Sequence, residues 1–180
     1  TTAHILSDIA IVYESTFKYN EAIEYYEQSL DLKSKIKDTI GISTLHENIA
    51  DVYFEKNDMD KAIDHFKKTL ELEEKLNNEE QVTTVLNNIG VAMYKKGDHK
   101  EAIRYYRKSL EMNKKLGDDK KVSISLNNIG NISYNKQNFS SAITYYNKSL
   151  KLKEGVNFST GIAISFHNLG NVYKDLKDFN

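Results

Sequence analysis

Apolar residues recur along the chain at spacings of three and four, with polar residues between them. Ile103, Tyr106 and Leu110 form one such run. This spacing is typical of one face of an α-helix, whereas a half-buried strand alternates with a period of two. The pattern therefore predicts an all-α protein.

The pattern repeats every 40 residues with no insertion. A fixed period of about 20 to 50 residues is typical of solenoids, in which each repeat contacts its neighbours. We predict one continuous module over residues 1–180, with repeats at about 1–38, 39–78, 79–118 and 119–158 and a half repeat at 159–180. The aligned apolar and small positions are Ile9, Ile49, Ile89, Ile129 and Leu169; Ala10, Ala50, Gly90, Gly130 and Gly170; Ala22, Ala62, Ala102 and Ala142; and Tyr26, Phe66, Tyr106 and Tyr146.

Two kinds of polar break divide each repeat into a pair of antiparallel helices. Asp98 precedes Glu101 by three residues, which predicts a capping box at a helix start. Gly117 is a candidate left-handed cap at a helix end, and Asp118 is placed to begin the next helix. A glycine within a helix costs roughly 1 kcal/mol relative to alanine. We therefore expect Gly90, Gly130 and Gly170 to mark close approaches of the paired helix.

These residues resemble the tetratricopeptide repeat family. Its pattern of a large apolar residue, an apolar residue followed by glycine, and then alanine, an aromatic and a small residue is matched in register by Leu126, Ile129, Gly130, Ala142, Tyr146 and Ser149. Departures are His46 at a large apolar position, Met93 and Ser133 at a tyrosine position, and the absence of proline. The long repeat is similar to kinesin light chains, Rap-type receptors and bacterial signalling proteins. The resemblance implies a right-handed superhelical α-solenoid of about 4.5 repeats.

In this family the first helix of each repeat lines a concave groove. One groove position reads Asp8, Asn48, Asn88, Asn128 and Asn168. The resemblance implies an asparagine ladder whose amides bind the backbone of an extended peptide. The alternative is that these amides bind neighbouring helices or face water.

Other groove positions differ between repeats and would select the peptide sequence. They include Glu47, Asn87 and Asn127; Asp51, Asn131 and Asn171; and Tyr94 and Tyr134. The N-terminal half is acidic, so a peptide with a cationic end would fit it, although a solvated charged face is an equal alternative. Positions that carry lysine or arginine in carboxylate-clamp repeats read His4, Thr44, Thr84, Ile124 and Ile164, which predicts poor binding of acidic tails.

Composition excludes several classes of function. Lys and Arg total 25 against 26 for Asp and Glu, so no basic field attracts nucleic acid. No apolar run approaches the roughly 20 residues of a membrane span. The five His have no metal-ligand spacing, Cys is absent, and no phosphate loop is present. We predict no enzyme activity, metal or cofactor, and a cytoplasmic location is favoured with the periplasm left open.

The sequence thus predicts a protein- or peptide-binding module. Alternatives are a ligand-sensing input domain of a bacterial signalling protein and a self-assembling scaffold. We expect the chain to be a fragment of a longer protein, with an apolar stripe of Phe166, Leu169, Val172 and Tyr173 on the last helix left uncovered and able to mediate homo-association.

Overall fold

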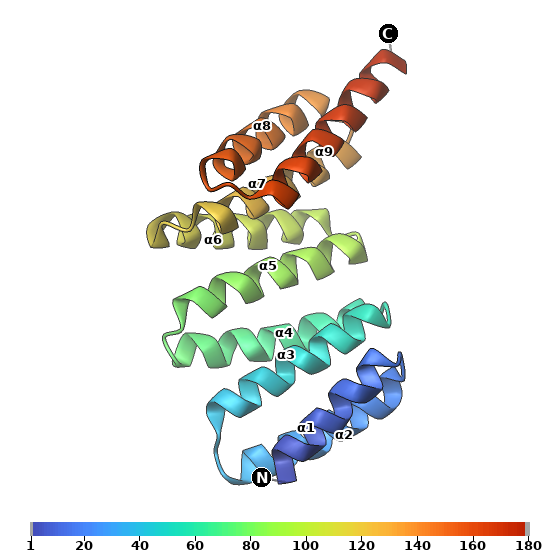
Figure 1. Ribbon diagram of the computed structural model, residues 1–180, viewed down its shortest axis with the longest axis vertical. Helices are drawn as coiled ribbons and strands as arrows, with labels where there is room; N and C mark the ends of the chain where they lie inside the picture. The colour runs from blue at the N-terminus through green and yellow to red at the C-terminus, as the bar shows by residue number, and fades with distance from the viewer. Residues whose placement is uncertain (1, 179–180) are drawn as a thin grey trace. The chain divides into compact units, whose positions relative to one another are not determined.

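The computed structural model describes residues 2–178, which form helices joined by short turns (Figure 1). Contacts divide the chain into two compact units, one up to Lys96 and the other from Gly97. Unit 1 contains α1 (Thr2–Ser15), α2 (Tyr19–Lys35), α3 (Thr39–Glu55), α4 (Met59–Lys75) and α5 (Glu79–Lys96). Unit 2 contains α6 (His99–Leu116), α7 (Asp119–Asn135), α8 (Phe139–Gly155) and α9 (Ser159–Asp178). The all-α solenoid class predicted from the repeat is confirmed.

A left-handed residue ends each helix that is followed by a turn, at intervals of 20 residues. The positions are Phe17, Lys37, Asn57, Asn77, Gly97, Gly117, Gln137 and Asn157, with φ between 53° and 92°. Asp98 accepts a hydrogen bond from Glu101 N at 3.1 Å, and Asp118 accepts one from Lys121 N at 2.8 Å. The predicted caps at Asp98, Gly117 and Asp118 are confirmed. In a capping box the Glu101 carboxylate would bind back to Asp98, but here it binds Arg104 Nη1 at 2.9 Å.

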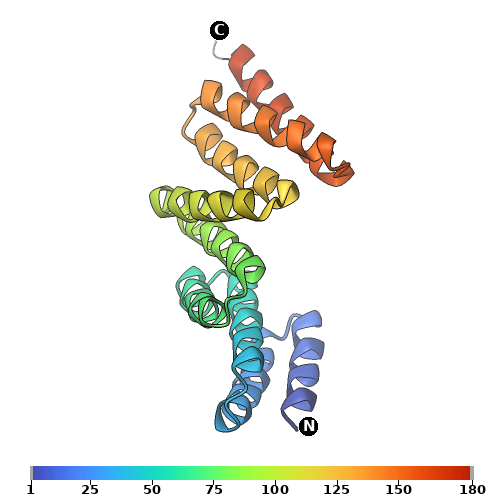
Figure 2. The same cartoon turned by 90° about the vertical axis from the view of Figure 1, so that its left-hand side faces the viewer.

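Consecutive helices within each unit pack as antiparallel hairpins (Figure 1; Figure 2). The core of unit 1 includes Ala22, Tyr26 and Ile49, and that of unit 2 includes Ala142 and Tyr146, all at the predicted register positions. The second helix of a repeat also bonds to the backbone of the first. Ser29 Oγ donates to Ala3 O at 2.8 Å, and Ser149 Oγ donates to Ser123 O at 2.7 Å, at the same two repeat positions.

The glycine position has different surroundings in different repeats. A Cβ placed on Gly130 would lie 2.6 Å from Tyr146 Cε1, so the close approach predicted there is confirmed. A Cβ on Gly170 would meet nothing within 4 Å among the described residues, but these residues include no helix that follows α9, so the packing role of Gly170 stays a prediction. For Gly90 the packing role stays a prediction.

One repeat position carries a buried polar side chain that sequence reasoning missed. It reads Lys33, Glu73, Asn113 and Lys153, exposed by 7%, 6%, 1% and 2%. Lys33 Nζ binds Asp38 Oδ2 at 2.6 Å, and this bond lowers the pKa of Asp38. Glu73 accepts hydrogen bonds from Ser43 Oγ and, at 2.8 Å, from Asn78 Nδ2. Lys33 and Glu73 thus satisfy the same buried position with different partners, whereas Asn113 Oδ1 has no hydrogen-bond partner among the described residues.

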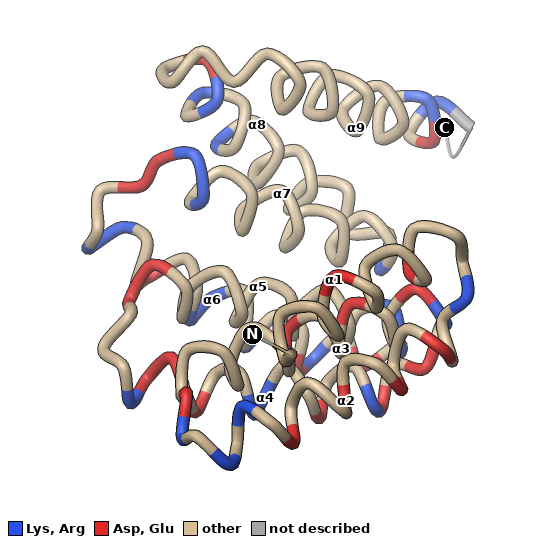
Figure 3. The backbone as a smooth tube through the Cα atoms, turned by 60° about the horizontal axis from the view of Figure 1, so that its bottom comes forward, with Lys and Arg blue, Asp and Glu red and all other residues tan. Residues whose placement is uncertain are grey.

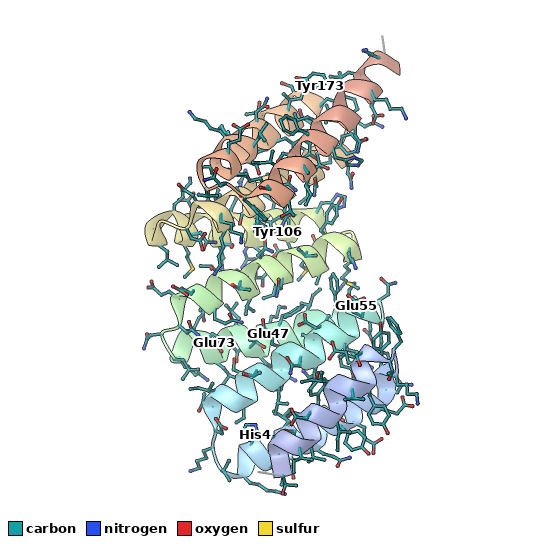
Figure 4. The ribbon with its side chains drawn as sticks, in the orientation of Figure 1. His4, Glu47, Glu55, Glu73, Tyr106 and Tyr173 are labelled. Carbon is teal, nitrogen blue, oxygen red and sulfur yellow. The ribbon has the colours of Figure 1, made fainter. Side chains whose placement is uncertain are left out.

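The apolar stripe predicted on the last helix is divided between two environments. Leu169 and Val172 are buried in the core that includes Tyr146 of α8. Phe166 remains exposed by 57%. Tyr173, which Figure 4 labels, is exposed by 52%. The prediction that all four residues share one uncovered stripe is therefore wrong for Leu169 and Val172.

Candidate functional site

In unit 1 the odd-numbered helices carry several polar residues at the predicted groove positions. Within this unit α1 and α3 lie in front of α2 and α4 (Figure 1). We define the polar face of unit 1 by five polar residues of α1, α3 and α5: Glu14, Glu47, Asn48, Asp51 and Asn88. Four predicted site residues of unit 1 are half-buried: Asn48 of α3 and Asn87, Asn88 and Tyr94 of α5.

A hydrogen-bond pair joins α3 to α5 on this face. Gln81 Nε2 lies 2.9 Å from Glu47 Oε1 and 2.7 Å from Glu47 Oε2. The pKa of Glu47 is raised, chiefly by burial. The Gln81 hydrogen bond opposes this rise, and the charge of Glu73 adds to it. Glu47 is therefore occupied by an internal donor, and Gln81 is a contact that the repeat register did not predict.

A hollow of about 150 Å³ opens next to Asp51, with lining residues from α3, α4 and α5. It is lined by Asp51, Phe54, Phe66, Asn88 and Val91, and we name it the Asp51 hollow. Two predicted site residues, Asp51 and Asn88, are brought together here. Phe54, Phe66 and Val91 give the hollow apolar walls. The volume corresponds to about five water molecules at the density of liquid water.

Carboxylates gather around Asp51. Glu47 and Glu55 lie along the same helix (Figure 4), and Figure 3 shows acidic residues within α1 and α3, whereas α7 carries charge only near its start. Asp51 is open to solvent, but surrounding protein displaces much of its water. Burial therefore raises its pKa to about 6, and the charges of Glu47, Glu14 and Glu55 contribute further.

Glu14 is satisfied from within the same unit, in contrast to Asp51. Tyr26 Oη donates to Glu14 Oε2 at 2.8 Å. Burial raises the pKa of Tyr26, and the hydrogen bond to Glu14 raises it further. Among the residues that the structure describes, no donor reaches the Asp51 carboxylate.

In unit 2 the asparagine positions bind one another across helices. Asn168 Nδ2 of α9 donates to Asn127 Oδ1 at 3.1 Å and lies 3.4 Å from Asn131 Oδ1, both on α7. Asn131 Oδ1 also accepts from Tyr146 Oη at 2.8 Å. Asn127 is buried and Asn128 half-buried. The structure thus brings Asn127, Asn131 and Asn168 together as contacts between helices.

The remaining predicted residues of unit 2 lie apart from this amide cluster. Tyr134 Oη donates to Asp175 Oδ2 at 2.5 Å, joining α7 to α9, and this bond raises the pKa of Tyr134. Asn171 Nδ2 contacts His167 Nε2 on its own helix at 3.1 Å. Asp175 was not predicted, because the repeat register does not indicate which groups face each other across helices.

A pair of histidines replaces the expected packing between α3 and α4. His46 Nδ1 lies 3.2 Å from His65 Nδ1. Burial lowers the pKa of both rings, that of His65 to about 4, and the Lys68 charge adds to the effect at each. Over residues 2–178, no three His, Cys, Asp or Glu side chains are grouped to hold a metal ion. No described helix combines the length and apolar character that a membrane crossing requires.

Several solved structures share this architecture. BtubC from P. vanneervenii superposes with a TM-score of 0.82 at 22% identity, covering 97% of this chain and 72% of that protein. A Signal Transduction ATPase with Numerous Domains, with a tetratricopeptide repeat sensor, from Pyrococcus horikoshii gives 0.79 at 26% identity, covering 97% and 27%. The apo form of RapI gives 0.78 at 16% identity, covering 98% and 69%. This chain therefore spans about a quarter of the ATPase.

Sequence comparison gives the family. Three tetratricopeptide repeat models match residues 2–36, 41–115 and 124–155. A search of curated proteins found no match. The matched segments together take in the greater part of both units, and the helix pairs have the packing that this repeat produces. The chain belongs to the tetratricopeptide repeat family.

Proposed function

We propose that this chain is an interaction module that binds an extended segment of a partner protein against the polar face of unit 1. Tetratricopeptide repeats mediate protein interactions. The observation that carries the proposal is the Asp51 hollow, which places a carboxylate, an amide and apolar walls from three helices at one solvent-accessible point. A ligand-binding site typically combines apolar walls with a small number of polar groups that point into it.

The asparagine ladder has a different role in each unit under this proposal. Asn48 and Asn88 of unit 1 would bind peptide backbone, because a carboxamide offers both a donor and an acceptor. Asn168 of unit 2 already donates to Asn127, so it would hold α7 and α9 together. The proposal involves no catalytic step and no cofactor.

A randomised peptide array probed with the protein tests this function. The double variant Asn48→Ala/Asn88→Ala should lose binding by about tenfold or more, because each lost hydrogen bond costs roughly 1 kcal/mol. Its free energy of unfolding should change little. The matched variant Asn168→Ala should instead lower stability. An array with no reproducible binding, or a double variant that binds like the parent, would contradict the proposal.

A regulatory input role is the second candidate. It is favoured by the 26% identity to an ATPase whose repeats are described as a sensor. Under this alternative, peptide binding would change the behaviour of an attached domain. Comparison of the full-length protein with and without the bound peptide, by hydrogen exchange outside residues 1–180, separates the two roles. If the bound peptide changes hydrogen exchange only at the polar face of unit 1, the regulatory role is contradicted and the binding module alone is supported.

A further inference from the structure

The acceptor in the Asp51 hollow lacks the internal donor that its counterpart in unit 2 has. In unit 2, Tyr146 Oη donates to Asn131 Oδ1 at 2.8 Å, fifteen residues earlier in the chain. Phe66 and Asp51 occupy the same two repeat positions in unit 1. Phenylalanine has no oxygen, so the acceptor at Asp51 receives no internal donor from this ring. The space and the acceptor remain open beside Asn88.

We propose that the Asp51 hollow accepts the side chain of a lysine or arginine from the bound segment. This inference rests on the proposed peptide-binding function and adds its selectivity. The aliphatic stem of such a side chain would pack against Phe54, Phe66 and Val91, while its cationic end would donate to Asp51 and to the Asn88 carbonyl oxygen.

Charge complementarity favours a cation over other occupants. Three further carboxylates, Glu14, Glu47 and Glu55, act on Asp51, so a positive charge would relieve their mutual repulsion. Glu14 and Glu47 have internal donors in Tyr26 and Gln81, and Glu55 does not line the hollow, which leaves Asp51 as the acceptor that gains most from a new one. An anionic or purely apolar side chain would leave this repulsion uncompensated.

One wall of the hollow already contacts an ammonium group. Lys95 Nζ of α5 lies 3.8 Å from the centre of the Phe54 ring, a geometry in which the ring face attracts a cation. Lys95 is not among the residues that line the hollow, so the Asp51 carboxylate stays open to a second cation.

Two substitutions change the hollow without removing the core. Asp51→Asn keeps the shape and removes the charge. Phe66→Tyr supplies the missing hydroxyl, which would donate to Asp51 as Tyr146 donates to Asn131. The matched controls are Asp64→Asn, which removes an exposed charge of α4, and Phe158→Tyr, which adds a hydroxyl immediately before α9. Circular dichroism verifies folding of each variant.

The probe is an array of random decapeptides, paired with an array in which norleucine replaces every lysine and citrulline every arginine. We expect the parent protein to prefer the cationic array by about tenfold or more, as a charge-assisted hydrogen bond predicts. Both substitutions at the hollow should abolish this preference, and both controls should keep it.

The outcomes separate this inference from the function on which it rests. Equal binding to both arrays would overturn the inference and leave the binding module intact. If Asp51→Asn and Phe66→Tyr both keep the preference for cationic peptides, the cation binds elsewhere on the protein, and this outcome would also overturn the inference. Absence of binding to every peptide would overturn both.

Discussion

Gly130 of α7 faces the ring of Tyr146 of α8 so closely that a Cβ would lie 2.6 Å from Tyr146 Cε1 and 2.7 Å from Tyr146 Cδ1. The ring is buried, and its hydroxyl is held by Asn131. The ring therefore has little freedom to move away. The glycine thus lets two helices approach, at the expense of its weak helix propensity.

Gly130→Ala should lower the free energy of unfolding by about 1–3 kcal/mol, the usual cost of overpacking a filled core. Gly170→Ala is the matched control, because a Cβ there meets no described atom within 4 Å. It should be neutral or stabilising by up to about 1 kcal/mol. Urea denaturation of both variants measures the difference. Equal effects would show that the Tyr146 contact does not explain Gly130.

Lys153→Met should stabilise the protein at neutral pH. Lys153 Nζ is buried and donates a hydrogen bond to the neutral hydroxyl Ser165 Oγ at 2.9 Å. Burial lowers the pKa of Lys153 from 10.5 to about 8. The unfolded chain binds more protons between pH 8 and 10.5, so this group makes stability rise with pH in that window. The gain below pH 8 should be on the order of 2 kcal/mol and shrink towards pH 10.5.

The matched control for this substitution is Lys33→Met, at the same position of another repeat. Lys33 Nζ has the carboxylate of Asp38 at 2.6 Å, so its loss should destabilise the protein rather than stabilise it. Denaturation series at pH 7, 8, 9 and 10 compare the two variants with the parent. Stabilisation by Lys33→Met, or a pH-independent effect of Lys153→Met, would refute the explanation.

The His46 and His65 pair should make the protein sensitive to acid. Burial lowers the pKa of both rings below 6.5, that of His65 to about 4. The unfolded chain therefore binds more protons in this window, and stability contributed by these rings is lost as pH falls from 6.5 to 4.

The variant His46→Leu/His65→Tyr introduces the residues that the other complete repeats carry at these positions. It should gain on the order of 2 kcal/mol over the parent at pH 4.5 relative to pH 7.5. Thermal melts at both pH values measure this difference. Asp51 titrates in the same range with the opposite sign, because its pKa is raised, so only the difference between variant and parent is informative.

Gln137→Gly should stabilise the turn between α7 and α8 by about 1 kcal/mol. Gln137 has φ 57°, in the left-handed region that disfavours residues with a Cβ. Gly117 occupies the equivalent position of the preceding turn with φ 71°. The reciprocal variant Gly117→Gln should lose a similar amount. Denaturant midpoints that move in the same direction for both variants would contradict this assignment.

Much of the fold follows from the sequence alone. The 40-residue register predicts which residues of each helix are buried, as Ile49, Tyr26 and Tyr146 illustrate. Asp98, Gly117 and Asp118 mark helix boundaries correctly, because caps are formed by residues within a few positions of each other. Local periodicity and local turn chemistry are thus readable without the tertiary structure.

The candidate site depends on which side chains meet across helices, and sequence spacing does not determine that. The register treats Asn88 and Asn168 as equivalent, yet Asn88 lines a hollow while Asn168 binds Asn127. Likewise, it does not predict that Tyr26 reaches Glu14 while Tyr146 reaches Asn131. Hydrogen bonds act over about 3 Å, so small differences in helix packing and side-chain length decide each partner. The sequence by itself determined the helices, their register and the family, whereas only the tertiary structure decided which polar groups are occupied internally and that Asp51 is left without a donor.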